Sequence, residues 1–244
     1  MNLTPFFQLL ILIGRPASGK SEITDYLKKV SPSQRRTRFH LADLEILDDF
    51  PMLWTWFEED QLLSEKLGQP RLHTTPQEYF LQDYFWDLLI ERLGLEYRKR
   101  LRDDPHYHDH KTTILEFSRG SQHGGYRQAF QHLPEEVLQR AGVIYIRVTF
   151  EESMRKNRLR FNPNRPDSIL EHSLSEAKMK RLYEIDDWDQ ISAGNSHYLK
   201  VGDHRVPYAV FENQDDVTTN HPDLLGARLE QVLAQLWAVY QSHN

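Results

Sequence analysis

The sequence contains a phosphate-binding pattern, G-x-x-x-x-G-K-S, at residues 14–21. Its two glycines let the backbone curl so that successive N–H groups point into one concavity, and a following helix adds the partial positive charge of its N-terminus. Lys20 supplies a cation for phosphate groups, and the Ser21 hydroxyl is a hard oxygen ligand of the kind that Mg²⁺ prefers. The pattern therefore predicts nucleoside triphosphate binding by Gly14, Arg15, Pro16, Ala17, Ser18, Gly19, Lys20 and Ser21.

The residues around this pattern predict the elements that must hold it. A continuous apolar run at residues 9–13 is typical of a strand buried on both faces, and the apolar positions after the pattern recur at helical spacing. Short apolar runs that predict further strands follow at residues 39–42, 112–117, 143–148 and 208–211. Because these runs alternate with amphipathic stretches, we expect a three-layer α/β fold with a mostly parallel, five-stranded sheet.

Two long segments interrupt this alternation. The chain has 244 residues, which is long for one simple domain, and the excess lies at residues 44–110 and 151–200. The first segment contains two or three predicted helices and many aromatic residues, and the second is rich in arginine. Neither segment carries a strand set of its own, so we expect a single domain over residues 1–244 with two insertions.

The composition excludes several classes of protein. Hydrophobic residues make up 39% of the chain, enough for a core, and the absence of cysteine excludes disulfide scaffolds and thiol nucleophiles. The net charge of -6 argues against binding to a nucleic-acid backbone. The most apolar run, residues 6–13, is too short to span a bilayer and lacks the features of a secretory signal, so we expect no membrane association and a cytoplasmic location. Nothing in the sequence indicates an oligomeric state.

The order of these parts resembles the P-loop kinases of small molecules, the family that contains adenylate kinase, deoxynucleoside kinases and shikimate kinase. A GTPase is disfavoured because N-K-x-D is absent, and the nearest string, at residues 164–167, has Arg in place of Lys. The resemblance implies a P-loop NTPase fold with strand order 2-3-1-4-5, with ATP as phosphate donor and Mg²⁺ as cofactor. The D-G-F-P-R string of adenylate kinases and the E-R-S string of deoxynucleoside kinases are both missing, so the resemblance does not identify the acceptor.

Two carboxylates lie where the resemblance implies catalytic and metal-binding groups. Asp43 follows the second predicted strand, and we expect it to bind the acceptor and take its hydroxyl proton. The alternative for Asp43 is the N-cap of a helix over residues 44–47. Glu116 lies near the end of the third predicted strand and is expected to hold Mg²⁺ together with Ser21, with a plain surface glutamate as the alternative.

Arginines after the fourth predicted strand resemble the lid of these kinases. Arg155 and Arg158 lie three residues apart, so one helix face presents both, and an anion between them would relieve their repulsion. Arg165 follows in a stretch that residues 162–164 should break into a loop. We expect these arginines, Arg158 first among them, to neutralise the transferring phosphoryl group together with Lys20. The alternative is a solvated basic helix paired with nearby glutamates.

Two further pairs are candidates for substrate contacts. Arg119 and Gln122 follow the third predicted strand and are expected to bind the acceptor, with capping of a helix near Gly125 as the alternative. Asn213 and Gln214 follow the last predicted strand, where the resemblance implies a loop along the adenine. Core packing is the default explanation for the aromatic residues of the first insertion, and stacking of one or two rings on a planar acceptor is the alternative.

Together these residues predict ATP-dependent phosphoryl transfer to a small acceptor, with nucleosides and nucleotides as the leading class. Two other functions stay open. One is a nucleotide-dependent switch or regulatory ATPase, in which the insertions bind a protein partner. The other is a kinase that acts on the end of a polynucleotide, which the net charge of -6 disfavours.

Overall fold

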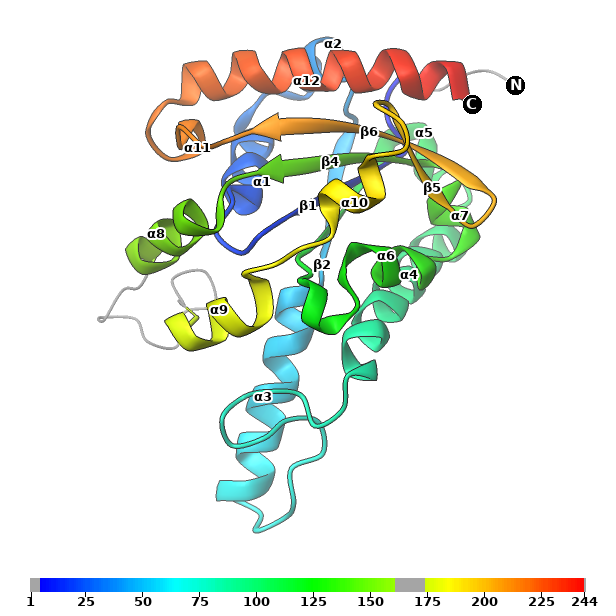
Figure 1. Cartoon of the computed structure of the whole chain (residues 1–244). Helices are drawn as coiled ribbons and strands as arrows, with labels where there is room; N and C mark the ends of the chain where they lie inside the picture. The colour runs from blue at the N-terminus through cyan, green and yellow to red at the C-terminus, as the bar shows by residue number, and fades with distance from the viewer. Residues whose placement is uncertain (1–4, 161–173, 244) are drawn as a thin grey trace.

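A six-stranded sheet forms the centre of the computed structural model, which describes residues 5–160 and 174–243. The strands stand in the order β2-β3-β1-β4-β6-β5 (Figure 1). Five of them are parallel, and β5 runs antiparallel to β6 at one edge. The α/β class, the parallel sheet and the order of its five parallel strands are therefore confirmed, and β5 is an addition that was not predicted. The strands are β1 Leu9–Gly14, β2 Asp43–Asp48, β3 Lys111–Phe117, β4 Ala141–Arg147, β5 Tyr198–Val201 and β6 His204–Glu212.

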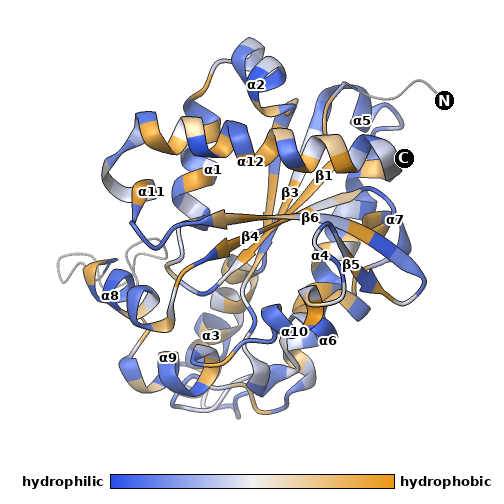
Figure 2. Cartoon of the chain, turned by 45° about the horizontal axis from the view of Figure 1, so that its top comes forward, coloured by the Kyte–Doolittle hydropathy of each residue, from blue (hydrophilic) through white to orange (hydrophobic). Residues whose placement is uncertain are grey.

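Helices cover both faces of the sheet because side chains of the central strands alternate between two apolar cores. In β1, Leu9, Ile11 and Ile13 pack on one side, whereas Leu10 and Leu12 pack on the other. Figure 2 shows the hydrophobic colour of the central strands between the helical layers. The first core is closed by α4 Tyr84–Asp103, α5 Tyr107–His110, α6 Gly125–Gln131, α7 Glu135–Leu138 and α10 Trp188–Ser192. The second is closed by α1 Lys20–Lys29, α2 Pro32–Phe39, α11 Val217–Asn220 and α12 Pro222–His243.

Two groups of helices stand beside this three-layer core. In the first, α3 Asp49–Glu65 and the loop after it extend beyond the sheet (Figure 1). Helix α3 packs on the start of α4 through a separate small core, which contains Leu53, Trp56, Phe85, Trp86 and Leu89. The second group is α8 Phe150–Arg160 and α9 Glu176–Tyr183, which pack through Met154, Met179 and Tyr183. Both groups follow the carboxyl ends of strands, where sites in open α/β sheets are found.

The second strand lies later in the chain than predicted. Residues 39–42 are not a strand, because Phe39 ends α2 and β2 covers Asp43–Asp48 instead. The alternative of a helix at residues 44–47 is wrong as well. Phe39 and Leu41 owe their apolar character to burial in the core beneath α12. The error shifts the carboxyl end of this strand by several residues, which changes the acidic side chains that reach the site.

The remaining elements are short. A 3-10 helix, Ser121–His123, follows β3, and β5 turns back onto β6 through Gly202, whose φ is 57°. Only Leu199 and Val201 of β5 are buried, so the strand left a weak signal in the sequence. Across the ranges that the structure describes, no helix is both long enough and apolar enough to cross a bilayer.

Candidate active site

The phosphate-binding pattern forms a tight loop between β1 and α1. Gly14 ends β1, and a Cβ there would lie 2.8 Å from the carbonyl oxygen of Ile146 on β4, so this backbone approach requires glycine. Ala17 and Gly19 adopt positive φ values of 56° and 116°, which curl the chain before α1 begins at Lys20. The loop therefore leads directly into the N-terminus of α1, where backbone N–H groups and the helix dipole favour an anion.

Side chains from three other segments hold the outside of this loop. Asn213, which is fully buried after β6, donates from Nδ2 to the carbonyl oxygen of Ser18 at 2.7 Å. Ser153 of α8 donates from Oγ to the carbonyl oxygen of Pro16 at 2.7 Å. Arg15 points away from the concavity and binds Asp186, with 2.8 Å between Nη1 and Oδ2. The loop is therefore fixed in shape by its surroundings.

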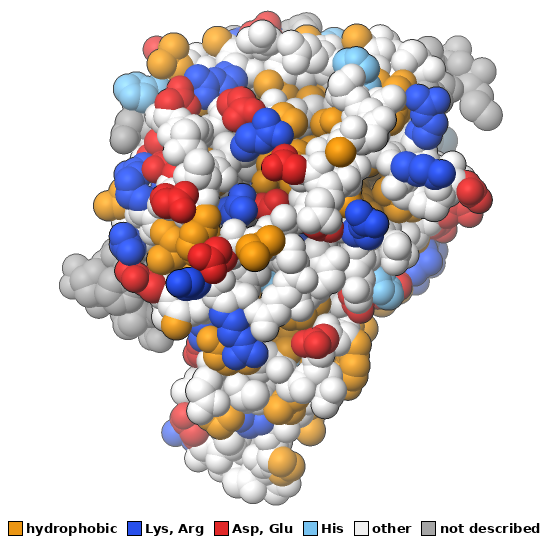
Figure 3. All heavy atoms as spheres, viewed as in Figure 1, with side chains coloured by type: hydrophobic (Ala, Val, Ile, Leu, Met, Phe, Trp, Pro, Cys, Tyr) orange, Lys and Arg blue, Asp and Glu red, His pale blue; other side chains and the backbone are white. Residues whose placement is uncertain are grey.

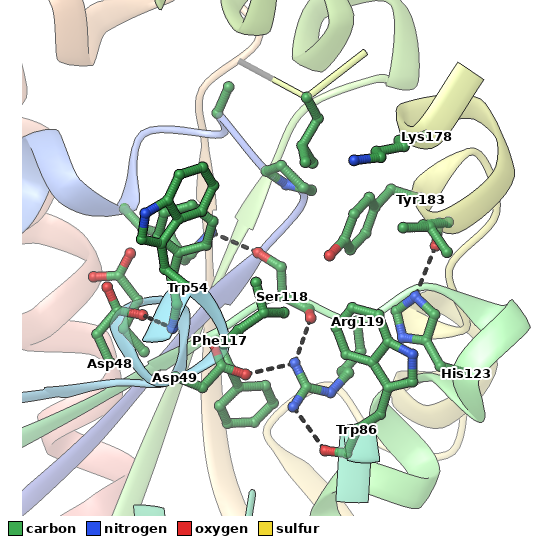
Figure 4. A pocket seen from close by; sticks show the side chains of 18 of the residues that line it. Asp48, Asp49, Trp54, Trp86, Phe117, Ser118, Arg119, His123, Lys178 and Tyr183 are labelled. Carbon is green, nitrogen blue, oxygen red and sulfur yellow. Dashed lines mark hydrogen bonds and ion pairs between the residues drawn. The ribbon is translucent and has the colours of Figure 1, made fainter. Parts of the chain in front are cut away.

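A cavity of about 460 Å³ opens in front of the loop. It is lined by Pro16, Ala17, Lys20 and Ser21 on one side and by side chains of α3, α4 and α9 on the other. Figure 4 shows this cavity, with Asp48 and Asp49 on one flank, Lys178 and Tyr183 on the opposite flank, and Ser118 between them. The arrangement brings a nucleotide-binding loop and a partly aromatic chamber into one space.

Three carboxylates meet Lys20 where β2 and β3 end. Asp48 lies opposite Glu116 in the register of the two strands, and Asp49 is the next residue along the chain. Burial, and then the neighbouring Glu116 and Asp49, raise the pKa of Asp48 to about 8. Burial also raises the pKa of Glu116 and lowers the pKa of Lys20, while Lys20 and Glu116 oppose each other's shifts. Lys20 donates from Nζ to Ser118 Oγ at 2.7 Å. Crowded carboxylates of this kind favour the approach of a cation.

These oxygen groups fit Mg²⁺ in the manner usual for nucleotide enzymes. Mg²⁺ takes one or two protein ligands and completes its shell with phosphate and water. Ser21 and Glu116 supply a hydroxyl and a carboxylate that both line the cavity. Within residues 5–160 and 174–243, no cluster of three or more His, Asp or Glu forms a metal site complete in itself. The donor set therefore suits an ion that arrives with a nucleotide.

The structure contradicts the prediction that Asp43 binds the acceptor. Asp43 is the first residue of β2 and lies opposite Lys111, the first residue of β3, so it stands at the far end of the strand from the phosphate loop. Its carboxylate is half exposed and pairs with Arg35 at 3.1 Å. Asp48, at the carboxyl end of the same strand, occupies the place that was assigned to Asp43.

The arginines of α8 are arranged differently from the prediction. Arg155 pairs with Glu152 and Asp216, and Arg158 pairs with Glu176 at 2.7 Å. Neither arginine lines the cavity. Arg160 lines the cavity instead. Its Nη2 lies 3.1 Å from Glu22 of α1. Arg165 lies outside the described residues, and its role stays a prediction.

Arg119 and Gln122, which follow β3, both line the cavity, but Arg119 already forms an ion pair with Asp49. Its Nη1 lies 2.6 Å from Asp49 and donates to the carbonyl oxygen of Ser118, and its Nη2 donates to that of Trp86 at 3.1 Å (Figure 4). Arg119 therefore ties β3 to α3 and α4. The helix at Gly125 is capped by Asp187 rather than Arg119, because the backbone N–H groups of residues 126 and 127 donate to that carboxylate. Gln122 lies against Arg181 of α9.

The loop after β6 meets the phosphate loop from behind. Asn213 donates to the carbonyl oxygen of Ser18, as described above, and Gln214 is exposed, with its Oε1 accepting from Thr149 N at 2.8 Å. Neither side chain lines the cavity. Their predicted contact with the adenine stays a prediction, and the structure adds a role in shaping the loop for Asn213.

A phosphate-binding loop between the first strand and first helix of this parallel sheet defines a P-loop kinase-like fold. No family model and no curated protein matches the chain. Among solved structures, it is similar to Kti12 from Chaetomium thermophilum, crystallised with ADP-AlF3, at a TM-score of 0.52 and 13% identity over 95% of this chain and 98% of that one. That similarity supports the fold alone. Shikimate kinase from Acinetobacter baumannii with shikimate is matched at a TM-score of 0.44 and 12% identity over 94% of both chains, too distant for any further argument.

Proposed function

We propose that this chain is an ATP-dependent kinase that transfers the γ-phosphate to the hydroxyl of a small acceptor, a nucleoside or nucleotide being the leading class. The observation that carries the proposal is the shared cavity. Lys20 and Ser21 open into the same space as Asp48 and the aromatic side chains of α3 and α4. A kinase must hold a hydroxyl in line with the γ-phosphate, and a chamber directly beside the phosphate loop supports that geometry.

Each group around the cavity has a role in this proposal. The loop N–H groups and Lys20 hold the phosphates, and Arg160 neutralises charge from the α8 side. Ser21 and Glu116 would hold Mg²⁺, which would further neutralise the phosphate charge. Asp48 orients the acceptor hydroxyl and takes its proton as the new O–P bond forms and the bond from the γ-phosphorus to the ADP oxygen breaks.

The insertions supply the walls in this proposal. The acceptor-binding part is the structured segment from α3 to the start of α4, within residues 44–110. The lid is formed by α8 and α9, within residues 151–200, because both helices line the cavity opposite α3. The charges on the face seen in Figure 3 support a small acceptor over a polynucleotide, since acidic and basic side chains are interspersed there rather than gathered in a basic stripe.

A transfer screen with labelled ATP tests the proposal. The purified chain is incubated with Mg²⁺, ATP and a panel of nucleosides, nucleotides and small hydroxyl metabolites, and Lys20→Ala serves as the matched inactive variant. Transfer of label to an acceptor by the native chain, lost in Lys20→Ala, supports the kinase. Tight ATP binding without transfer to any acceptor would contradict the proposed kinase activity.

A regulatory ATPase that binds a protein partner is the second candidate. Its support is a set of large apolar side chains that are exposed near the far end of α3, namely Leu62, Leu67 and Leu72. Such a set can form part of a protein interface. A protein that co-purifies with the native chain and is lost when these leucines are changed to serine would favour this candidate, provided the screen above finds no acceptor.

A further inference from the structure

The wall of the acceptor side of the cavity is built largely from aromatic rings. Trp54 and Phe57 of α3, Phe80 before α4, Trp86 of α4 and Tyr183 of α9 all line it. In Figure 4, Trp54 and Tyr183 lie on opposite sides of Ser118. Aromatic walls favour a flat, apolar ligand body over a strongly hydrated one.

Two of the three cations on this side of the cavity are neutralised within the protein. Arg119 is only 2% exposed, pairs with Asp49 at 2.6 Å and donates to two carbonyl oxygens. Lys178 of α9 pairs with Glu78. A phosphate on the acceptor would therefore have to displace an existing carboxylate at either position.

The third cation, Arg181, lines the cavity but is open to solvent. Its side chain is exposed, and its guanidinium lies over the ring of Tyr79 at 4.3 Å from the centroid. Within the described ranges, the acceptor side, taken apart from Lys20 and Arg160 at the phosphate loop, therefore offers a phosphate no cation that is both shielded from solvent and unpaired.

From these three observations we propose that the acceptor is an uncharged planar compound bearing a hydroxyl group, and that its phosphorylated form is rejected. The inference rests on the proposed kinase function and narrows its substrate class. A phosphate group would bring about two negative charges into a chamber where Arg119 and Lys178 are already paired with carboxylates. An uncharged ring system meets the aromatic walls without the cost of desolvating that charge.

Matched pairs of ligands test the proposal. Each pair consists of an uncharged planar alcohol and its phosphate ester, for example several nucleosides with their 5′-monophosphates and aromatic alcohols with their phosphates. Binding is measured by tryptophan fluorescence in the presence of Mg²⁺ and ADP, and kcat/KM is measured for every pair that accepts label. We expect the uncharged member to bind at least about tenfold more tightly, which corresponds to ~1.4 kcal/mol.

The outcomes separate this inference from the proposed function. Preferred binding of uncharged members without any transfer supports the chamber chemistry and overturns the kinase. Transfer that prefers phosphorylated members supports the kinase and overturns the inference. Failure of every uncharged planar member to bind also overturns it.

Two variants sharpen the test. Glu78→Gln releases Lys178 from its carboxylate, so binding of phosphorylated members should strengthen about tenfold while that of uncharged members changes little. Arg181→Ala removes the solvent-exposed cation and should leave the ratio between the two members of a pair unchanged. A selective loss of phosphorylated ligands in Arg181→Ala would identify Arg181 as a phosphate-binding group and overturn the inference. Melting of both variants with Mg²⁺ and ADP checks that the phosphate loop is intact.

Discussion

Asp48 and Asp43 stand at opposite ends of β2 and form a matched pair for testing the chemistry. Replacement of Asp48 by Asn is expected to lower kcat by about 10²- to 10⁴-fold, the usual contribution of a general base. Asp43→Asn removes a half-exposed ion pair with Arg35 and should leave kcat within about twofold. Steady-state kinetics with the acceptor found in the screen compares the two. Equal losses in both variants would contradict the placement of the base.

Asp60 has a structural role that its sequence context does not suggest. It is fully buried in α3 and accepts hydrogen bonds from the backbone N–H groups of Leu72 at 2.8 Å, His73 at 2.9 Å and Thr74 at 2.6 Å. Burial by itself raises the pKa of Asp60, but these hydrogen bonds and the Thr74 hydroxyl outweigh burial and hold the pKa at about 2. The carboxylate thus anchors the loop after α3 to the helix.

Asp60→Asn is expected to lower the free energy of unfolding by on the order of 2–3 kcal/mol near neutral pH, because an amide replaces a charged acceptor. The folded pKa of about 2 lies below the usual value of about 3.9, so this stabilisation is present above about pH 4 and is lost as the pH falls towards 2. Urea unfolding near neutral pH and near pH 3 should show a smaller difference at the lower pH. The exposed neighbour Glu59→Gln should change neither value. A pH-independent difference would rule out an ionised anchor.

At the level of elements, α8 presents its inner face to the phosphate loop through Ser153, Asn157 and Arg160. The prediction for Arg155 and Arg158 rested on their spacing alone. The buried side of this helix is formed by other residues, namely Ser153, Met154, Lys156 and Asn157. Helical geometry then places Arg160 on the inner side and Arg158 on the outer side. The face with small and amide side chains is therefore the one that brings an arginine, Arg160, to the cavity.

Replacement of Arg160 by Gln is expected to lower kcat/KM for ATP by about 10- to 10³-fold, because a cation facing the transferred phosphate is lost. Arg158→Gln is the matched control on the same helix, since it removes only an exposed ion pair with Glu176. Its kinetics should stay within about twofold of those of the native chain. A larger loss in Arg158→Gln than in Arg160→Gln would restore the original assignment of the arginines.

The phosphate loop depends on the segment after β6 for its shape. Gly19→Ala would place a Cβ 2.7 Å from Asn213 Nδ2 and 2.8 Å from Thr218 Oγ1, in addition to the strain of its φ of 116°. We expect this variant to lose binding of Mg²⁺ and ADP, measured by calorimetry. Gly202→Ala is the control, because Gly202 also has a positive φ but has nothing within 4 Å of the added carbon. It should cost about 1–2 kcal/mol of stability and keep nucleotide binding. Retained binding in Gly19→Ala would show that Asn213 and Thr218 can move aside without loss of the loop's shape.

For the whole molecule, the sequence was informative where one pattern dictates one local geometry. The phosphate loop and the strongly apolar strands could be predicted, because continuous apolar runs and the glycine-lysine pattern have few alternatives. The order of the strands was implied only by the resemblance to the P-loop kinases. The residues around the acceptor chamber could not be predicted, since they come from four separate segments. One error over β2 moved the expected base from Asp48 to Asp43. Edge strands such as β2 carry weak apolar signals, so their ends are the least certain.

Arg15 has a consequence for how two ligands would influence one another. Its guanidinium donates to the carbonyl oxygens of Tyr183 and Glu184 and pairs with Asp186, so the loop that meets the nucleotide is joined to the chain directly after α9. At its other end, α9 meets the acceptor wall through the ion pair between Lys178 and Glu78. Coupling between the two sites would be reciprocal. If the nucleotide raises the affinity for the acceptor by some factor, the acceptor raises the affinity for the nucleotide by the same factor. Calorimetry of each ligand in the presence of the other should show this synergy in the native chain and its loss in Arg15→Gln.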